Sequence, residues 1–149
     1  MIEGVIIKTL KKFEDERGWV SEIFREDETD YRPAMAYASY SRNGVVRGPH
    51  EHVSQSDFFC FFGPGNFMMH LWDNRESSPT CGEHMEMEVG ENNPATITIP
   101  PGVVHGYKCI SEAGAWYVNM PDELYAGEGK KEAVDEIRHE SDPSSKFKF

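Results

Sequence analysis

The chain has 149 residues and a formal net charge of -11, and these two numbers exclude several classes of protein. This length suits one domain around one hydrophobic core, so we expect a single domain over residues 1–149. The acidic excess argues against a general nucleic-acid binder, which would present a basic surface to phosphates. An anionic small molecule remains a suitable partner, because a few arginines create a local positive site on an acidic protein.

The sequence also suggests where the protein works. No apolar stretch is long enough to span a bilayer, and residues 1–18 lack the basic flank and apolar core of a secretory signal. The three cysteines, Cys60, Cys81 and Cys109, are odd in number and unrelated in spacing. They are typical of reduced thiols rather than of a disulfide framework, so we expect a cytoplasmic protein without membrane contact.

Short extended segments separated by Gly and Pro turns dominate the chain. The alternation of apolar and polar residues and the supply of β-formers predict strands at residues 5–10, 19–25, 34–41, 45–48, 57–62, 67–73, 84–89, 96–100, 103–110 and 115–119. Residues 57–62 are apolar at nearly every position, which is typical of a strand buried on both faces. Many short strands at close spacing indicate an all-β sandwich or barrel.

The C-terminal part of the chain has a different composition. Residues 129–137, GKKEAVDEI, have helical composition and predict a short C-terminal helix. The polar tail, residues 141–149, is expected to fray. We interpret His70, His84 and His139 as ordinary polar residues of strands or loops.

The stretch GVVRGPHEH, residues 44–52, carries the first functional signal. His50 and His52 are two residues apart, so on a strand their side chains point to the same side. They could share a metal ion. Alternatively, one of them could act as a base beside Arg47, a residue suited to binding an anion.

Four segments together resemble the dTDP-4-dehydrorhamnose 3,5-epimerase family, small jelly-roll proteins of the cupin superfamily. They are FEDERGWVSEIF (residues 13–24), SRNGVVRGPH (41–50), WDNRESSPTCG (72–82) and IPPGVVHGY (99–107). The resemblance implies a double-stranded β-helix that usually forms a homodimer. It also implies a dTDP-linked 4-keto-6-deoxy sugar as substrate, epimerised or isomerised without a cofactor.

The resemblance also implies roles for individual residues. His50 matches the histidine that acts as base, His105 matches a second active-site histidine, and Tyr117 matches the tyrosine that acts as acid. The chemistry is consistent with these residue types. A proton beside a ketone is acidic, a histidine can remove it near neutral pH, and a tyrosine on the opposite face can return a proton to invert the carbon.

Binding roles follow from the same resemblance. Arg17 and Glu22 match positions that hold the nucleotide, and Arg47 matches an arginine that lines the sugar and phosphate site. Guanidinium groups suit a diphosphate because their planar donors pair with its oxygens.

The chain departs from the family pattern at three places. Asp57 stands where the family has a lysine that faces the ketone oxygen, and Met69 stands where it has an aspartate. The C-terminal aspartate that orients the family's base has no evident counterpart. A related isomerase, an epimerase at a single carbon, or a non-catalytic nucleotide-sugar binder therefore remain open alternatives.

The same histidines also fit a metal site of the cupin superfamily. Gly44 is followed by five residues and then His50-Glu51-His52, and Pro100-Pro101-Gly102 precedes His105 by the expected spacing. His50, His52 and His105, with Asp57 as a possible fourth ligand, would suit a divalent metal such as zinc or iron. In that case His50 could not act as a free base, and the metal would polarise a ketone or water instead.

Overall fold

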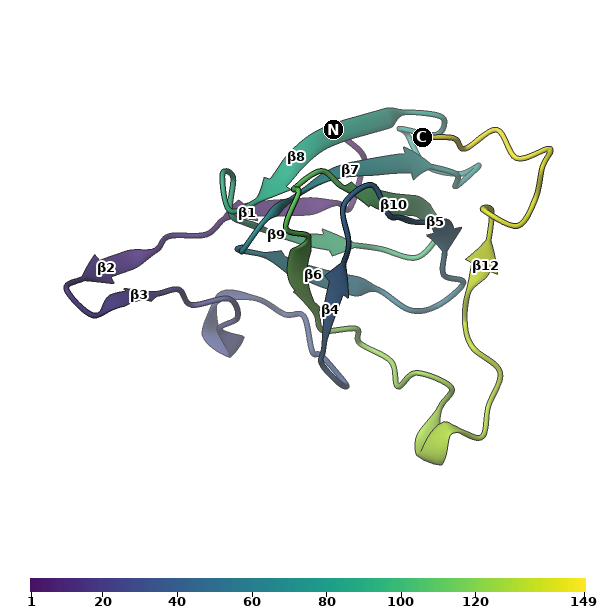
Figure 1. Cartoon of the computed structure of the whole chain (residues 1–149). Coiled ribbons are helices and arrows are strands. Elements are labelled where there is room, and N and C mark those ends of the chain that lie inside the picture. Colours follow the sequence, from purple (N-terminus) through teal and green to yellow (C-terminus); the bar gives the residue numbers. More distant parts are fainter.

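The structure is a computed structural model that describes residues 1–149, and it consists of two antiparallel five-stranded sheets packed face to face (Figure 1). Sheet I has the order β1 (Ile6–Thr9), β9 (Ala95–Ile99), β6 (Asp57–Phe61), β11 (Ala115–Asn119) and β4 (Tyr37–Ser41). Sheet II has the order β12 (Ile137–Arg138), β5 (Val46–Glu51), β10 (Val103–Cys109), β7 (Asn66–Asp73) and β8 (His84–Gly90). The prediction of an all-β sandwich is confirmed.

The core lies between the two sheets, because alternate side chains of each strand point inward. In β7, Phe67, Met69 and Leu71 are fully buried, whereas the residues between them are partly exposed. Every residue of β6 is buried, since Phe59 faces the core and Phe58 packs in a second cluster on the other face of sheet I. The expectation that this strand is covered on both faces is therefore confirmed.

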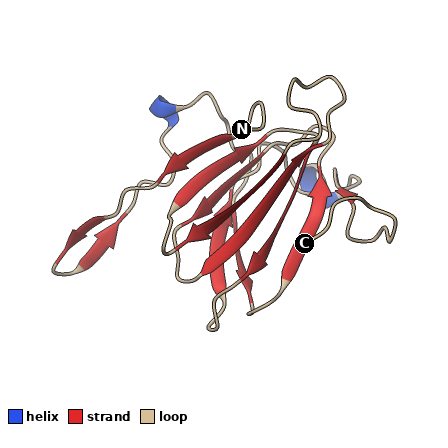
Figure 2. Ribbon diagram, turned by 90° about the horizontal axis from the view of Figure 1, so that it is seen from above, coloured by secondary structure: helices blue, strands red, loops and turns tan.

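A separate hairpin, β2 (Phe13–Asp15) and β3 (Gly18–Val20), projects away from the two sheets (Figures 1 and 2). All six of its strand residues are exposed. A two-stranded hairpin gains little stability by itself, and here it leaves the apolar side chains of Phe13, Trp19 and Val20 exposed. Its extended position therefore suits a contact with something outside this chain.

The C-terminal segment does not form the expected helix. The only helical element there is a single 3-10 turn, η2 (Glu128–Lys130), in which Gly129 is left-handed with φ 65. The chain then becomes extended and adds β12 to the edge of β5. Backbone pairing with an existing sheet edge outweighs the helical preference of this short segment, because isolated helices of this length are marginal in water.

The tail is also ordered against the body, contrary to the expectation that it frays. Phe147 is buried, and its ring packs against Trp72 and His139. The Nε2–H of His139 in turn donates to the carboxylate of Glu51 at 2.8 Å, on the adjoining strand β5. The two apolar rings of the KFKF ending are thus enough to dock a segment that is otherwise polar.

No helix of this chain could cross a bilayer, since η1 (Glu26–Glu28) and η2 have three residues each.

Gly48 allows β5 to approach β10 closely, and we expect Gly48→Ala to destabilise the fold. Its φ is +80, and an added Cβ would lie 2.6 Å from the carbonyl oxygen of His105. The strain and the clash together should lower the free energy of unfolding by about 1–3 kcal/mol, measured by urea denaturation. Gly44→Ala is the matched control, because Gly44 has φ +75 but nothing within 4 Å. Equal losses in the two variants would contradict this account.

Candidate active site

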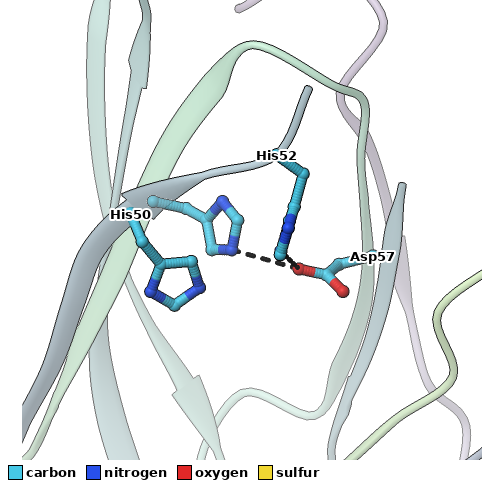
Figure 3. A group of neighbouring side chains, drawn as sticks. His50, His52 and Asp57 are labelled. Atoms are coloured by element: carbon cyan, nitrogen blue, oxygen red, sulfur yellow. Dashed lines mark hydrogen bonds and ion pairs between the residues drawn. The ribbon is translucent and has the colours of Figure 1, made fainter. Parts of the chain in front are cut away.

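Histidines from β5 and β10 meet inside the molecule. His50 and His105 are paired directly across the two antiparallel strands, and their ring centroids are 4.5 Å apart. The ring of His52 lies 5.6 Å from that of His50 and 5.8 Å from that of His105. Figure 3 shows His50, His52 and Asp57 turned toward a common interior space. The two sequence motifs therefore converge on one site.

Asp57, at the start of β6, connects these histidines to sheet I. Its Oδ2 lies 3.1 Å from the Nε2 atoms of both His52 and His105 (Figure 3). Its Oδ1 accepts hydrogen bonds from Asn119 at 2.8 Å and Gln55 at 3.0 Å. Burial alone would raise the pKa of this carboxyl, but the contacts with His105 and His52 hold it well below its usual range. Asp57 is therefore a buried anion.

His52 has an acceptor at each ring nitrogen. Nδ1 faces the carbonyl oxygen of Asp135, and Nε2 faces Asp57 Oδ2. Both of these partners accept, which favours an imidazolium with a proton on each ring nitrogen, although the amide nitrogen of Gln55 also lies 3.2 Å from Nε2. Burial lowers the pKa of His52, but the hydrogen bond and charge of Asp57 and the contact with Asp135 outweigh it and raise the pKa to about 9.

His105 is the most deeply placed of the three histidines, with 1% of its surface exposed. Its Nδ1 lies 3.0 Å from the carbonyl oxygen of Val103, so Nδ1 carries a proton and donates it. Its Nε2 is close to Asp57 but makes no hydrogen bond. A bare lone pair facing a carboxylate is unfavourable, so this position requires a proton or a cation between the two groups.

His50 has a different environment from its neighbours. Burial, followed by the nearby His105 and His52, lowers its pKa to about 2. Its ring is therefore neutral near pH 7 and has a nitrogen free to accept a proton. Its Nδ1 lies 3.6 Å from Oε1 of Glu136, which in turn accepts a hydrogen bond from Arg138 at 2.7 Å.

Glu136 reaches His50 because the C-terminal segment is anchored on both sides of it. The carboxylate of Asp135 accepts hydrogen bonds from the backbone of Val53, Ser54 and Gln55, which holds its pKa at about 2 despite partial burial. Directly after Glu136, β12 pairs with β5. The sequence shows no aspartate matching the family's orienting residue, but this segment places the carboxylate of Glu136 beside His50. Sequence reasoning missed it because residues 129–137 were assigned to a helix.

A cavity of about 1060 Å³ opens above these residues, between the end of the sandwich and the C-terminal segment. Arg47, His50 and His52 line it from β5 and the residue after it, and Tyr37, Asp57 and Tyr117 line it from sheet I. His105 does not line it. Its predicted place among the active-site histidines therefore rests on its contacts with His50 and Asp57 rather than on contact with the cavity.

Tyr117 belongs to a group of phenols that the sequence did not reveal. Its hydroxyl lies 2.5 Å from that of Tyr107, on β10, and its ring packs 6.4 Å from that of Tyr37. Burial, with the neighbouring Tyr117, raises the pKa of Tyr107 well above its ordinary value. Tyr107 is therefore protonated at neutral pH, and its hydroxyl is hydrogen bonded to that of Tyr117.

Arg17 and Glu22 lie outside this cavity. Arg17 is in the turn of the projecting hairpin, with 84% of its side chain exposed, and pairs with Asp15. Glu22 pairs with Arg25 at 3.2 Å. Within one chain the structure does not bring these two residues to the histidines, so the expectation that they share a site with His50 fails for a single copy.

An antiparallel jelly roll of two sheets, with a cavity lined by histidines and tyrosines at its end, is typical of cupins. The model of the dTDP-4-dehydrorhamnose 3,5-epimerase family matches residues 1–141, and the chain belongs to this family of isomerases.

Individual relatives agree with this assignment. The chain is 40% identical to the spore coat polysaccharide biosynthesis protein SpsL of Bacillus subtilis, over 75% of this chain and 74% of that protein. It is 37% identical to the probable low-salt glycan biosynthesis epimerase Agl13 of Haloferax volcanii, over 83% and 81% of the two chains. The fold matches that of a dTDP sugar isomerase from Desulfovibrio desulfuricans with a TM-score of 0.82, at 24% identity, covering 95% and 87% of the two chains.

Proposed function

We propose that this protein is a cofactor-independent epimerase of a dTDP-linked 4-keto-6-deoxy sugar that supplies precursors for a polysaccharide or glycan. The observation that carries the proposal is geometric: His50 lines the cavity with Glu136 beside it, and the phenols of Tyr37 and Tyr117 line it from the opposite sheet. We further propose that residues 1–149 act as one domain in the cytoplasm, where the three free cysteines would stay reduced.

His50 is the base in this proposal. It removes a proton from a carbon beside the ketone, and the electrons move onto the ketone oxygen as an enolate. The ring becomes an imidazolium in that step, and the carboxylate of Glu136, 3.6 Å away, stabilises the new charge. Glu136 is therefore a positioning and charge-stabilising residue for the base.

Tyr117 returns the proton. It lies on β11 of sheet I, whereas His50 lies on β5 of sheet II, so the two groups approach a bound sugar from opposite walls. Inversion requires this arrangement, because the proton must leave one face of the carbon and arrive at the other. Tyr107 supports the step by hydrogen bonding to the hydroxyl of Tyr117.

The positive charge for the enolate comes from histidine rather than from lysine. Asp57 occupies the position of the family's lysine and cannot stabilise an anion itself. It holds His52 as an imidazolium at the cavity wall, with His105 behind. A fixed cation beside the developing enolate lowers the barrier electrostatically.

Solvent exchange tests the reaction. The purified protein is incubated in deuterated water with dTDP-linked 4-keto-6-deoxy sugars of several configurations, and proton loss beside the ketone is followed by NMR. Incorporation of deuterium at C3 or C5 of the sugar supports the proposal. Binding of the nucleotide sugar without any exchange would favour the non-catalytic binder.

Glu136→Gln should lower kcat about 10- to 100-fold, because the imidazolium formed at His50 loses its carboxylate partner. KM should stay near the wild-type value, since Glu136 is not expected to bind the sugar. Glu136→Asp should recover part of the rate. An equal loss in both variants, or a change confined to KM, would argue against this role.

The nucleotide site points to a homodimer. Arg138 pairs with Glu136, whereas Arg47 hydrogen bonds only to neutral groups of Ser41 and Tyr40, so Arg47 is the better candidate to meet a diphosphate at the cavity wall. Arg17, in the projecting hairpin, and Glu22, just after it, do not line the cavity of their own chain but could reach that of another copy. We therefore propose that each hairpin completes the site of its partner, as the exposed strands of the hairpin suggest.

Mixing two inactive variants tests this arrangement. Arg17→Ala and His50→Asn, unfolded and refolded together, should give mixed dimers with one intact site each. Activity should return to about a quarter of the wild-type value, since half of the dimers are mixed and half of their sites are intact. If both residues served the same chain, the mixture would be no more active than its separate components.

A metal-dependent reaction is the second candidate, and a specific observation favours it. Nitrogen atoms of His50, His52 and His105 and an oxygen of Asp57 all lie within 4.8 Å of one another, and His105 Nε2 is buried without a hydrogen bond. This donor set fits zinc or iron, which would polarise a ketone or water. Metal analysis of the purified protein separates the two candidates: a stoichiometric ion that is lost in His52→Ala would favour the metal enzyme.

A further inference from the structure

A second group of histidines lies on the outer face of sheet II. His70 on β7 and His84 on β8 approach each other, with Nδ1 of His70 and Nε2 of His84 3.1 Å apart. The carboxylate of Glu86 lies 3.8 Å from the same Nδ1. Glu86 is the cross-strand partner of His70, and His84 is the diagonal neighbour, so the sheet itself brings the three together.

This group is separate from the proposed active site. In the register of β10 and β7, His105 is opposite Leu71, and both are buried on the inner face. His70 is the residue before Leu71, so its side chain points to the other face. Met85 and Met87 pack against the core, which leaves His84 and Glu86 on the outside of β8. The active-site cavity does not include any of the three residues.

Aromatic neighbours hold the two imidazoles in place. The ring of Trp72 stacks on His84 with centroids 4.8 Å apart and an interplanar angle of 9°. Phe149, from the docked tail, packs its ring 4.6 Å from that of His70. Ring nitrogens of His70 and His84 hydrogen bond only to each other, so no other protein group competes for their lone pairs.

We propose that His70, His84 and Glu86 form a binding site for a divalent transition metal such as copper, nickel or zinc. Two imidazole nitrogens and one carboxylate oxygen are a suitable ligand set for these ions. With metal–nitrogen bonds of about 2.1 Å, neighbouring ligands lie about 3 Å apart, close to the separation of the two nitrogens. Without metal, the N–H of one imidazole donates a hydrogen bond to the other ring.

Binding requires a small adjustment that the site can make. The ion displaces the proton shared by the two rings, and the exposed ring of His84 turns so that both lone pairs meet at the ion. Glu86 is largely exposed and can swing toward it, bringing a negative charge. Water would complete the coordination, because the site is open to solvent on its outer side.

Copper titration of the whole chain provides a local test, since bound Cu²⁺ quenches a neighbouring indole and Trp72 touches His84. Wild-type protein should show saturable quenching with Cu²⁺ alone, and His84→Ala should weaken it at least tenfold. Glu86→Gln should weaken it less, whereas Glu88→Gln, on the same face of β8, should behave as wild type. Trp72→Phe should remove the signal but retain one equivalent of Ni²⁺ by calorimetry.

The catalytic assay separates this proposal from the active site, because His84→Ala should keep full epimerase activity. The proposal is overturned if wild-type protein shows no saturable quenching, or if His84→Ala titrates like wild type. Quenching that disappears in His52→Ala but persists in His84→Ala would assign the ion to the central cluster and equally overturn it.

Discussion

His50→Asn should abolish deuterium exchange beside the ketone, with a loss of about 10²- to 10⁴-fold in kcat, the contribution typical of a general base. Asparagine keeps a polar group of similar size in the β5 strand but cannot accept the proton. Because His50 makes no close hydrogen bond in the structure, the variant should fold as well as wild type. Binding of the substrate should change little, since the lost interaction develops only during proton transfer.

A matched control uses another histidine of the same protein. His70→Asn changes a residue on the outer face of sheet II and should leave epimerisation unchanged. Thermal unfolding of both variants excludes a general loss of structure. If His50→Asn retained exchange within tenfold of wild type, a different residue would have to be the base.

Asp57→Asn should cause the largest loss of stability. Asp57 is 2% exposed and lies between His52 and His105. Removing its charge leaves the imidazolium of His52 in the interior without its counter-ion, which typically costs about 3–5 kcal/mol. Asn119 and Gln55 could still donate to the amide oxygen of the new side chain. The loss of stability therefore reflects the missing charge more than missing hydrogen bonds. Urea denaturation at pH 6 measures it.

The pH dependence of the free energy of unfolding tests whether the ion pair between Asp57 and His52 is the source of this stability. The pKa of folded His52, about 9, lies above its ordinary value of 6.5. The unfolded chain therefore loses this proton first, so the stabilisation is complete below pH 6.5 and disappears as the pH rises to 9. Over that window, wild-type protein should lose on the order of 3 kcal/mol.

Asp57→Asn should show a much flatter profile between pH 6.5 and 9, because the pKa of His52 is no longer raised by the carboxylate. Asp142→Asn is a suitable control, since it also removes an aspartate but one on the exposed tail. Its profile should parallel that of wild type. A wild-type profile that stayed flat across this window would mean that His52 is neutral in the folded protein.

The sequence by itself determined the architecture and the central residues of the site. Alternation of side chains along short strands predicts a two-sheet sandwich, because apolar residues must reach one core from alternate positions. His50 and His52 on one side of a strand, and His105 in a second motif, are also visible in sequence. The residue types and their spacing are enough to predict acid–base or metal chemistry at this site without a structure.

Tertiary structure decided which groups surround these histidines. The local sequence pattern could not place Glu136 beside His50. Its segment has helical composition, but in the structure it is extended and leads into β12, which pairs with the edge of β5. The proximity of Tyr107 to Tyr117 depends on two strands of different sheets. The same holds for Arg17, because its proposed role in binding the nucleotide depends on a second copy of the chain. Such long-range contacts depend on how sheets and termini pack, and residues close in sequence do not encode them.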